Sequence, residues 1–328
     1  MVAPVRYPDT VPRVAALVIH PRQTLSFDQF CATDGPAVAL DGYVVGPTRC
    51  DATGQHASFD HHAGVDRATT PATCQQVAAA IRDGVALLVD DHGRPRPQLL
   101  VHVNDPDPDV ALSWWLLNHP SLWDHPVVRR LVDLEGRLDA SGGTIADADI
   151  DWLEVLAWVI EPWATARRSI PSLDAEGMAG VIDAVCVRID ELVAGRPGQL
   201  ELTTSYELLH EVGPVWAICE HHPLARAAAV AEGARALVSV LPGPHPTTGT
   251  VTLCKADSDV PVDLELVYAD LNLIEGRDLS DLDRWGGSDL VGGSPRSAGT
   301  HLSLDDIVDA VLARYGDDPG RSPVPVRG

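Results

Sequence analysis

Asp60, His61 and His62 stand in a row directly after residues 56–59, a short segment with the pattern of a strand. Three adjacent side chains cannot all line one face of a regular strand or helix. They can converge on one point only where a strand ends and the backbone turns. A carboxylate beside neutral imidazoles is a ligand set for a divalent transition metal such as Mn²⁺, Fe²⁺ or Zn²⁺. The triplet therefore predicts a metal site, and an exposed polar loop is the alternative.

The sequence around this triplet alternates between strand-like and helix-like patterns. Short continuous apolar runs are typical of strands buried on both faces, and the segments between them have helical spacing. This alternation predicts an α/β fold with a parallel, doubly wound sheet. In such sheets, ligands bind beyond the carboxyl ends of the strands. The expected strands are residues 14–19, 37–40, 56–59 and 98–103, and the expected helices include residues 71–88, 110–117 and 126–138.

All four of these strands end at candidate metal ligands. A random placement of acids and histidines would rarely achieve this four times, so the pattern is the strongest argument that the residues alone provide. Because the carboxyl ends of parallel strands meet at one edge of the sheet, we expect these side chains to lie together. The ligands that this reasoning predicts are His20, Asp41, Asp60, His61, His102, Asp105, Asp107 and Asp109.

The rest of the chain has the pattern of a helical connector followed by a smaller α+β domain. Strand-like runs at residues 236–241, 249–255 and 262–268 predict a small mixed sheet in that second domain. The expected division is a metal-binding domain at 1–143, a helical connector at 144–212, a smaller domain at 213–320 and a disordered tail at 321–328.

Two motifs of the second domain could carry chemistry. Glu220-His221-His222 echoes the first triplet, but Pro223 and a predicted helix at 224–237 follow, so we interpret it as the start of a helix. A glycine-rich loop precedes the last helix, and the backbone N–H groups of such loops bind anions, as does an Arg guanidinium. A plain flexible turn is the alternative. The expected substrate-binding residues are Gly292, Gly293, Ser294, Arg296 and His301.

Composition limits the classes of protein and partner. A length of 328 residues suits two domains, and a net charge of −23 argues against a long nucleic-acid track without excluding a small anionic substrate. Six scattered cysteines without a C-x-x-C pair predict reduced thiols and a cytoplasmic protein. The sequence has no apolar signal-peptide segment and no apolar run of about 18 residues, so we expect no membrane partner.

Several of these residues together resemble the DHH phosphoesterase superfamily. The resemblance lies in Asp41, in the Asp60-His61-His62 triplet 19 positions after it, and in Gly292-Gly293-Ser294-Pro295-Arg296 far downstream. Members include single-strand exonucleases, nano-RNases, cyclic-dinucleotide phosphodiesterases and family II pyrophosphatases. The resemblance implies a parallel-sheet domain with a two-metal Mn²⁺ site, joined by a linker helix to a smaller domain that carries the substrate loop. Dimers are common in such proteins, so a homodimer is an open alternative.

The resemblance also implies roles for single residues. Asp41 is similar to the carboxylate that bridges the two metals. Asp60, His61 and His62 are similar to the motif that names the family, in which the histidines contact metal or phosphate and take part in catalysis.

The first motif of the family departs from its usual form, H-x-x-x-D-x-D. His20 is in place, but Thr24 and Ser26 stand where the two carboxylates should be, and Asp28 is the nearest substitute for a metal ligand. The later aspartate of the family is matched by Asp105, Asp107, Asp109 or Asp139, whereas Glu135 is expected on a solvated helix face. A site with one metal, or with a rearranged second metal, is therefore an alternative to the two-metal site.

These observations lead to three hypotheses. The first is a metal-dependent phosphoesterase that acts on a nucleotide, a short oligonucleotide or a cyclic dinucleotide, with Mn²⁺ favoured over Fe²⁺ or Zn²⁺. The second is a metal-dependent hydrolase or lyase for a non-phosphate substrate, because a fold does not fix its chemistry. The third is a non-catalytic binding protein, which would be favoured if no metal binds.

Overall fold

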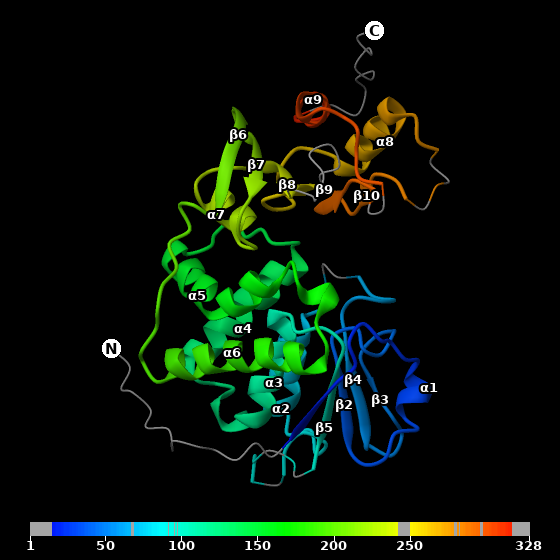
Figure 1. Cartoon of the computed structure of the whole chain (residues 1–328), viewed down its shortest axis with the longest axis vertical. Helices are drawn as coiled ribbons and strands as arrows, with labels where there is room; N and C mark the ends of the chain where they lie inside the picture. Colours follow the sequence, from blue (N-terminus) through cyan, green and yellow to red (C-terminus); the bar gives the residue numbers. More distant parts are fainter. Residues whose placement is uncertain are drawn as a thin grey trace. The chain divides into compact units, whose positions relative to one another are not determined.

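The computed structural model describes residues 15–66, 69–90, 92–94, 96, 98–241, 250–278, 281, 283–295 and 298–316. These residues form a mixed α/β protein with two separate sheets (Figure 1). The chain divides into two compact units, of which the first extends to Ala140 and resumes at Val155–Leu200, and the second contains Ser141–Glu154 and the residues from Glu201 onward. The segment predicted as a connector, residues 144–212, is thus shared between the two units. The predicted tail at 321–328 lies outside the described residues.

The first unit is built on a five-stranded, mostly parallel sheet, which confirms the α/β expectation. Four parallel strands correspond to the apolar runs of the sequence, and a two-residue antiparallel strand is added at one edge. Both β2 and β4 are buried along their whole length, as the continuous apolar run of β2 predicts, although β4 also contains His56 and Ser58. The strands in spatial order are β1 (Ala16–Ile19), β5 (Leu100–Val103), β2 (Ala37–Leu40), β4 (His56–Phe59) and β3 (Arg49–Cys50).

Helices cover the two faces of this sheet unequally. The short helix α1 (Phe27–Phe30) packs Phe27 and Phe30 against Ala37 and Ala39 on one face. Figure 1 shows most of the other helices of this unit on the opposite side of the sheet from α1. These are α2 (Thr73–Arg82), α3 (Pro108–Asn118), α4 (Pro126–Ala140) and α6 (Ala175–Val193), while α5 (Ile150–Ala166) begins in the second unit and ends in the first.

Helix α3 is the central helix of the first unit, and every one of its residues is buried. Its start is well defined by the sequence. The Asp107 side chain accepts a hydrogen bond from the backbone N–H of Val110 at 2.7 Å, and Pro108 occupies the first turn, where no backbone donor is needed. The cap fixes the position of Asp109 one residue into the helix.

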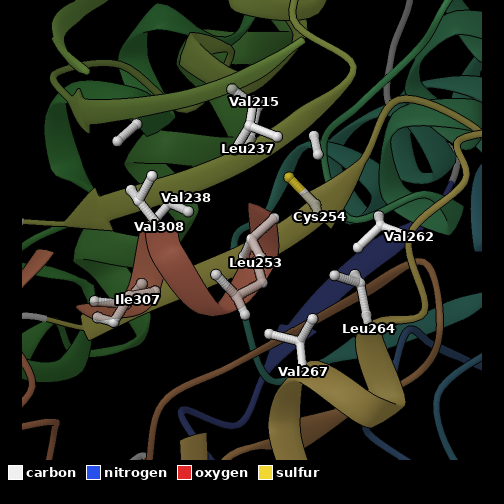
Figure 2. Close-up of a cluster of buried hydrophobic side chains, with 14 of the residues drawn as sticks. Val215, Leu237, Val238, Leu253, Cys254, Val262, Leu264, Val267, Ile307 and Val308 are labelled. Carbon is white, nitrogen blue, oxygen red and sulfur yellow. The ribbon is translucent and has the colours of Figure 1, made fainter. Parts of the chain in front are cut away.

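The second unit is built on a six-stranded mixed sheet, in which β7 and β8 are parallel and the other neighbours are antiparallel. Figure 2 shows its core, where apolar side chains of the sheet meet those of α8 and α9. The strands in spatial order are β10 (Gly286–Gly287), β11 (Val291–Gly293), β9 (Thr250–Lys255), β8 (Ala236–Leu241), β7 (Val215–Glu220) and β6 (Tyr206–Val212), and the helices are α7 (Ala225–Ala231), α8 (Leu264–Glu275) and α9 (Leu304–Ala313).

Two element predictions in this unit are wrong. Residues 262–268 were expected to form a strand, but α8 begins at Leu264, because the Asp263 side chain caps it by accepting from Leu266 N at 3.0 Å. A short apolar run does not separate the two periodicities, and only the later buried positions of α8 fix the helical one. The helix expected over 224–237 ends at Ala231, because Gly233 takes a left-handed φ of 125° and β8 follows.

Lys255, the only lysine of the chain, is buried in the second unit. Its Nζ donates to Asp289 Oδ2 at 2.6 Å and to the Val262 carbonyl at 3.0 Å. Asp289 Oδ1 in turn accepts from the backbone N–H of Leu264 at 3.0 Å, so this pair joins the end of β9 to the start of α8. No helix in the described part of the chain is long and apolar enough to cross a membrane.

Candidate metal centre

The parallel register of the first sheet places two aspartates side by side. Leu40 of β2 pairs with Phe59 of β4, so Asp41 and Asp60 follow the ends of adjacent strands. The backbone N–H of Asp41 donates to the Phe59 carbonyl at 2.9 Å. Asp41 has a φ of 47°, a left-handed conformation that costs a non-glycine residue about 1 kcal/mol. Such strained positions are common at functional sites.

His61 lies at the centre of the acidic side chains. It is fully buried, and its Nε2 lies 3.7 Å from Asp41 Oδ1, 3.9 Å from Asp109 Oδ2 and 2.5 Å from Asp139 Oδ2. The contact with Asp139 does not have the angles of a hydrogen bond. Neighbouring His62 has a side chain that is 40% exposed, and its Nδ1 lies 3.3 Å from Asp41 Oδ1. His62 therefore connects the buried acids with solvent.

Two groups of three potential ligands share His61. The first group is Asp41, His61 and His62, and the second is His61, Asp109 and Asp139. Within each group, one ligand atom from each residue lies within 4.8 Å of the others. Two ligands on opposite sides of an ion at about 2.1 Å lie roughly 4.2 Å apart, so these spacings suit a bound metal. The structure thus brings the two histidines of the triplet together with Asp41 after β2, Asp109 of α3 and Asp139 of α4, whereas Asp60 belongs to neither group.

The start of α2 orients two of these acids. Asp109 accepts from the backbone N–H groups of Thr73 at 2.8 Å and Cys74 at 2.6 Å, which are orphan donors of the first helical turn. The Thr73 hydroxyl donates to Asp41 Oδ1 at 2.9 Å. Each carboxylate oxygen keeps a second lone pair for a further partner. These contacts have no local signal in the sequence, because they join α2 to residues more than thirty positions away.

Burial crowds the acids and raises the pKa of most of them. Burial and the neighbouring charge of Asp109 raise the pKa of Asp41 well above its usual value. Burial and the charge of Asp41 do the same for Asp107, whose side chain is hydrogen-bonded to that of Asp41. Burial also raises the pKa of Asp109 and of Glu135. These acids repel one another, so a cation among them would stabilise their ionised forms.

Asp60 behaves differently. Burial alone would raise the pKa of Asp60, but hydrogen bonds from His62 outweigh this effect and lower it. Its Oδ1 accepts from His62 Nδ1 at 2.9 Å and from the His62 backbone N–H at 3.0 Å. Asp60 Oδ2 and His61 Nδ1 are buried and have no hydrogen-bond partner among the described residues. Orphaned polar atoms of this kind are rare in folded proteins, and a metal ion would satisfy such atoms.

The donor set of the centre fits a divalent metal. It offers carboxylate oxygens and imidazole nitrogens, which suit Mn²⁺, Fe²⁺ and Zn²⁺. After burial, another acid is the group that acts most strongly on the pKa values of Asp41, Asp107 and Glu135. For Asp109 the hydrogen bond to Cys74 acts most strongly and lowers its pKa, while the charge of Asp139 raises it. These buried Asp and His clusters could therefore hold a metal ion.

Glu135 was expected on a solvated face, and this is wrong. Its side chain is buried on α4, one helical turn before Asp139, and the charges of Asp109 and Asp139 act on it. Which face of a helix is buried depends on its neighbours in space, so the sequence of an amphipathic helix does not show which of its acids are buried.

His20 and His102 form a pair of their own. His20 Nε2 lies 3.0 Å from His102 Nδ1, and Tyr43 stacks on the His20 ring at 4.7 Å. His102 pairs with Ala39 inside the sheet, so its side chain lies on the face that packs against α1. Burial lowers the pKa of His20, and burial followed by the His20 charge lowers the pKa of His102 to about 4. Neither histidine belongs to a ligand group of the described residues.

Three further predicted ligands also lie outside the ligand groups of the described residues. Asp28 is exposed on α1. Asp105 is half-buried, and burial raises its pKa although Arg22 opposes this effect. Asp107 contacts the centre only through its hydrogen bond to Asp41. The roles of these three residues as ligands stay predictions.

The predicted substrate loop is in part a strand. Gly292 and Gly293 belong to β11, and Ser294 exchanges hydrogen bonds with Val251, to which its N–H donates at 2.9 Å and from which its Oγ accepts at 3.0 Å. A Cβ on Gly292 would lie 2.4 Å from the Tyr268 hydroxyl, and one on Gly293 would lie 2.5 Å from the Val251 carbonyl. These glycines thus permit close packing of strands, and Ser294 closes the pairing.

The other residues of the predicted loop are not organised around a ligand. His301 is exposed, and its backbone N–H donates to Glu275 Oε1 at 2.7 Å. Arg296 lies outside the described residues. The Glu220–His222 segment precedes a helix as expected, with His222 Nδ1 accepting from Leu224 N at 3.1 Å. Substrate binding by this region stays a prediction.

Comparisons with known proteins do not identify the chain. No model of a known protein family matches it, and no curated protein sequence matches it either. The resemblance to the DHH superfamily therefore stays a prediction that rests on the motif residues.

Proposed function

We propose that this protein is a metal-dependent phosphoesterase that hydrolyses a small or short phosphorylated substrate, such as a nucleotide, a short oligonucleotide or a cyclic dinucleotide. The observation that carries the proposal is the pair of ligand groups that share buried His61. The finer architecture is part of the same proposal: a doubly wound DHH-type domain joined to a smaller substrate-binding domain. Mn²⁺ is the ion we favour, because oxygen ligands predominate in the centre.

The residues of the two groups would divide between two ions. His61 Nε2 has a single lone pair, so it can bind only one ion. A carboxylate with two oxygens must then connect the two positions, and Asp41 is suited to this because it contacts both histidines. Asp109 and Asp139 would complete the second position. Bound divalent ions would polarise the phosphoryl oxygens and lower the pKa of a coordinated water.

The chain itself supplies orientation and proton transfer. Asp109 is held by two backbone N–H groups of α2, so its carboxylate is fixed before any ligand arrives. His62 donates from Nδ1 to Asp60, which holds the tautomer and stabilises the imidazolium form. Because His62 is partly exposed, it is placed to give a proton to a leaving oxygen. This role is an alternative to metal ligation through Nδ1, which would require the bond to Asp60 to break.

A second candidate function is a metal-dependent hydrolase or lyase for a non-phosphate substrate. It is favoured by the second unit, where Gly292 and Gly293 lie in a strand and Ser294 is paired with Val251 instead of forming an anion-binding loop. The metal centre supports either reaction, because the fold does not fix the chemistry.

The test is the metal content of the full chain purified without chelator, followed by hydrolysis assays on short oligonucleotides and cyclic dinucleotides. Asp60→Ala and His61→Ala should lose the metal, and Asp28→Ala, which changes an exposed acid outside the ligand groups, should keep it. About two equivalents of Mn²⁺ or Fe²⁺ with phosphodiester hydrolysis support the proposal. One equivalent without such hydrolysis favours the non-phosphate reaction. If neither the wild type nor any variant contains metal, both enzyme hypotheses fail and the non-catalytic binding protein is favoured.

A further inference from the structure

A third group of ligand-type side chains lies at the other end of β4. It consists of Cys31, Asp51 and His56, and one ligand atom from each lies within 4.8 Å of the others. Cys31 directly follows α1, Asp51 lies between β3 and β4, and His56 is the first residue of β4. At about 3.3 Å per residue, β4 separates His56 from Asp60 by roughly 13 Å. The group is therefore distinct from the acidic centre.

The surroundings of His56 fix which ring nitrogen carries the proton. His56 Nε2 lies 3.1 Å from the carbonyl oxygen of Thr33, which can only accept a hydrogen bond and is the nearer of the two acceptors that face the ring, so we take Nε2 as the donor of the neutral ring. The lone pair of the neutral ring then lies on Nδ1, which is 3.4 Å from Asp51 Oδ2. Metal-binding histidines commonly have this arrangement, with the other N–H donated to a carbonyl or carboxylate.

Asp51 is an acceptor as well. The backbone N–H groups of Gln55 and His56 donate to its Oδ1 at 2.9 and 3.1 Å, and the Thr53 hydroxyl contacts its Oδ2. The bond from Thr53 and those from His56 and Gln55 lower the pKa of Asp51, so the carboxylate is ionised. In the tautomer with its proton on Nε2, the Nδ1 lone pair and the carboxylate lie 3.4 Å apart, and a cation between them would satisfy both.

Cys31 distinguishes a metal ion from a simple proton on His56. A proton on Nδ1 would satisfy the His56–Asp51 pair and leave the nearby thiol without a role. Burial and the charges of Asp51 and Asp28 raise the pKa of Cys31, so the thiol stays protonated unless a cation joins the group. A thiolate, an imidazole and a carboxylate form a ligand set for Zn²⁺, whereas the two ligand groups of the acidic centre contain no cysteine.

We propose that Cys31, Asp51 and His56 form a second metal site, specific for a thiophilic divalent ion such as Zn²⁺, that joins the end of α1 to the start of β4. The site is structural, and it does not depend on the function proposed above. It fixes the beginning of the strand whose other end carries Asp60, His61 and His62.

Co²⁺ is the probe that separates this site from the acidic centre, because only a thiolate ligand gives a sulfur-to-cobalt charge-transfer band in the near ultraviolet. One equivalent of Co²⁺ added to the metal-free full chain should produce the band, and Zn²⁺ should remove it. Cys31→Ser and His56→Gln should weaken Co²⁺ binding at this site by about tenfold or more. Cys50→Ser, which alters an exposed cysteine next to Asp51, and Asp60→Asn should both keep the band.

Three outcomes would overturn the proposal: no band with excess Co²⁺, a band that persists in Cys31→Ser, or a band that depends on Cys50. A second experiment needs only the wild-type chain, in case a variant does not fold. Zn²⁺ should slow the alkylation of Cys31 by iodoacetamide and leave that of Cys50 unchanged, as measured by mass spectrometry of the cysteine peptides. Equal alkylation rates of Cys31 with and without Zn²⁺ would also overturn the proposal.

Discussion

Replacing His102 with glutamine should make the stability of the first unit less sensitive to acid. His102 is 5% exposed, and burial followed by the charge of His20 lowers its pKa to about 4, compared with about 6.5 for an unperturbed histidine. Between these two pH values the unfolded chain binds a proton that the folded chain does not. The wild type therefore loses stability as the pH falls from 6.5 to 4, and the loss is complete below pH 4.

The size of this effect follows from the two pKa values. Each tenfold difference in proton affinity corresponds to about 1.4 kcal/mol, so the difference between 6.5 and about 4 corresponds to about 3 kcal/mol. Most of this should be visible between pH 7 and pH 4.5. His102→Gln has no proton to take up at this position, so its free energy of unfolding should fall by about 3 kcal/mol less than that of the wild type over the full range.

The assay is urea unfolding of the chelator-treated full chain at a series of pH values, with histidine NMR resonances as a direct readout of the pKa. The difference in pH dependence is informative even if His102→Gln also lowers the stability at pH 7, because that loss is present at every pH. His92→Gln changes an exposed histidine and should leave the pH dependence unchanged. Equal pH dependence in His102→Gln and the wild type would refute the reasoning, as would an NMR pKa near 6.5. Metal content should be unchanged in His102→Gln, and a loss of metal would restore the sequence-based assignment of His102 as a ligand.

Three further predictions follow from particular contacts. Gly293→Ala should destabilise the second unit by about 1–3 kcal/mol, as measured by thermal unfolding, because its Cβ would meet the Val251 carbonyl. Gly286→Ala, which has open space around it, should change the stability by less than about 0.5 kcal/mol in the same assay. Equal effects of the two substitutions would contradict the packing role of the glycine pair at 292–293. Binding of Mn²⁺ to the acidic centre should release protons, because burial and neighbouring carboxylates raise the pKa values of Asp41 and Asp107 and a bound cation would lower them. Calorimetric titrations in buffers of different ionisation enthalpy should therefore differ, and the affinity should rise with pH. Identical heats in the different buffers would contradict this. Glu135→Met should stabilise the metal-free chain more at pH 8 than at pH 5, as measured by urea unfolding. Burial raises the pKa of Glu135, so the folded wild type becomes less stable as the pH rises above 4.5, the usual pKa of a glutamate. A stabilisation that does not depend on pH would contradict this prediction.

The strand ends of the first sheet were the most predictable part of the molecule. The run before Asp41 is apolar at every position, the strand before Asp60 is short and buried, and in a parallel sheet such strands end at the same edge. To predict that Asp41 lies next to the triplet, only the order of the strands in the sheet was therefore needed. His102 was harder, because it lies inside β5 and not beyond its end, and a shift of one residue moves a side chain to the other face of a sheet.

Other features have no local signal in the sequence. The contact of Asp109 with the start of α2 joins segments that only the fold brings together. The burial of Glu135 depends on the helices packed around α4 and not on its own neighbours in the chain. The glycine pair at 292–293 has the composition of a loop, and only the closeness of Tyr268 and Val251 reveals that small residues serve the packing of a strand.

Lys255 gives the molecule a built-in reporter of its own motion. It carries the only side-chain amine of the chain, and that side chain is 2% exposed. A reagent that acetylates amines can reach it only when the end of β9 and the start of α8 separate. Each modified Lys255 therefore records one opening of the second unit, and the rate of labelling in native buffer measures how often that unit opens locally. No label or probe has to be introduced, because the surface presents guanidinium groups where most proteins present amines.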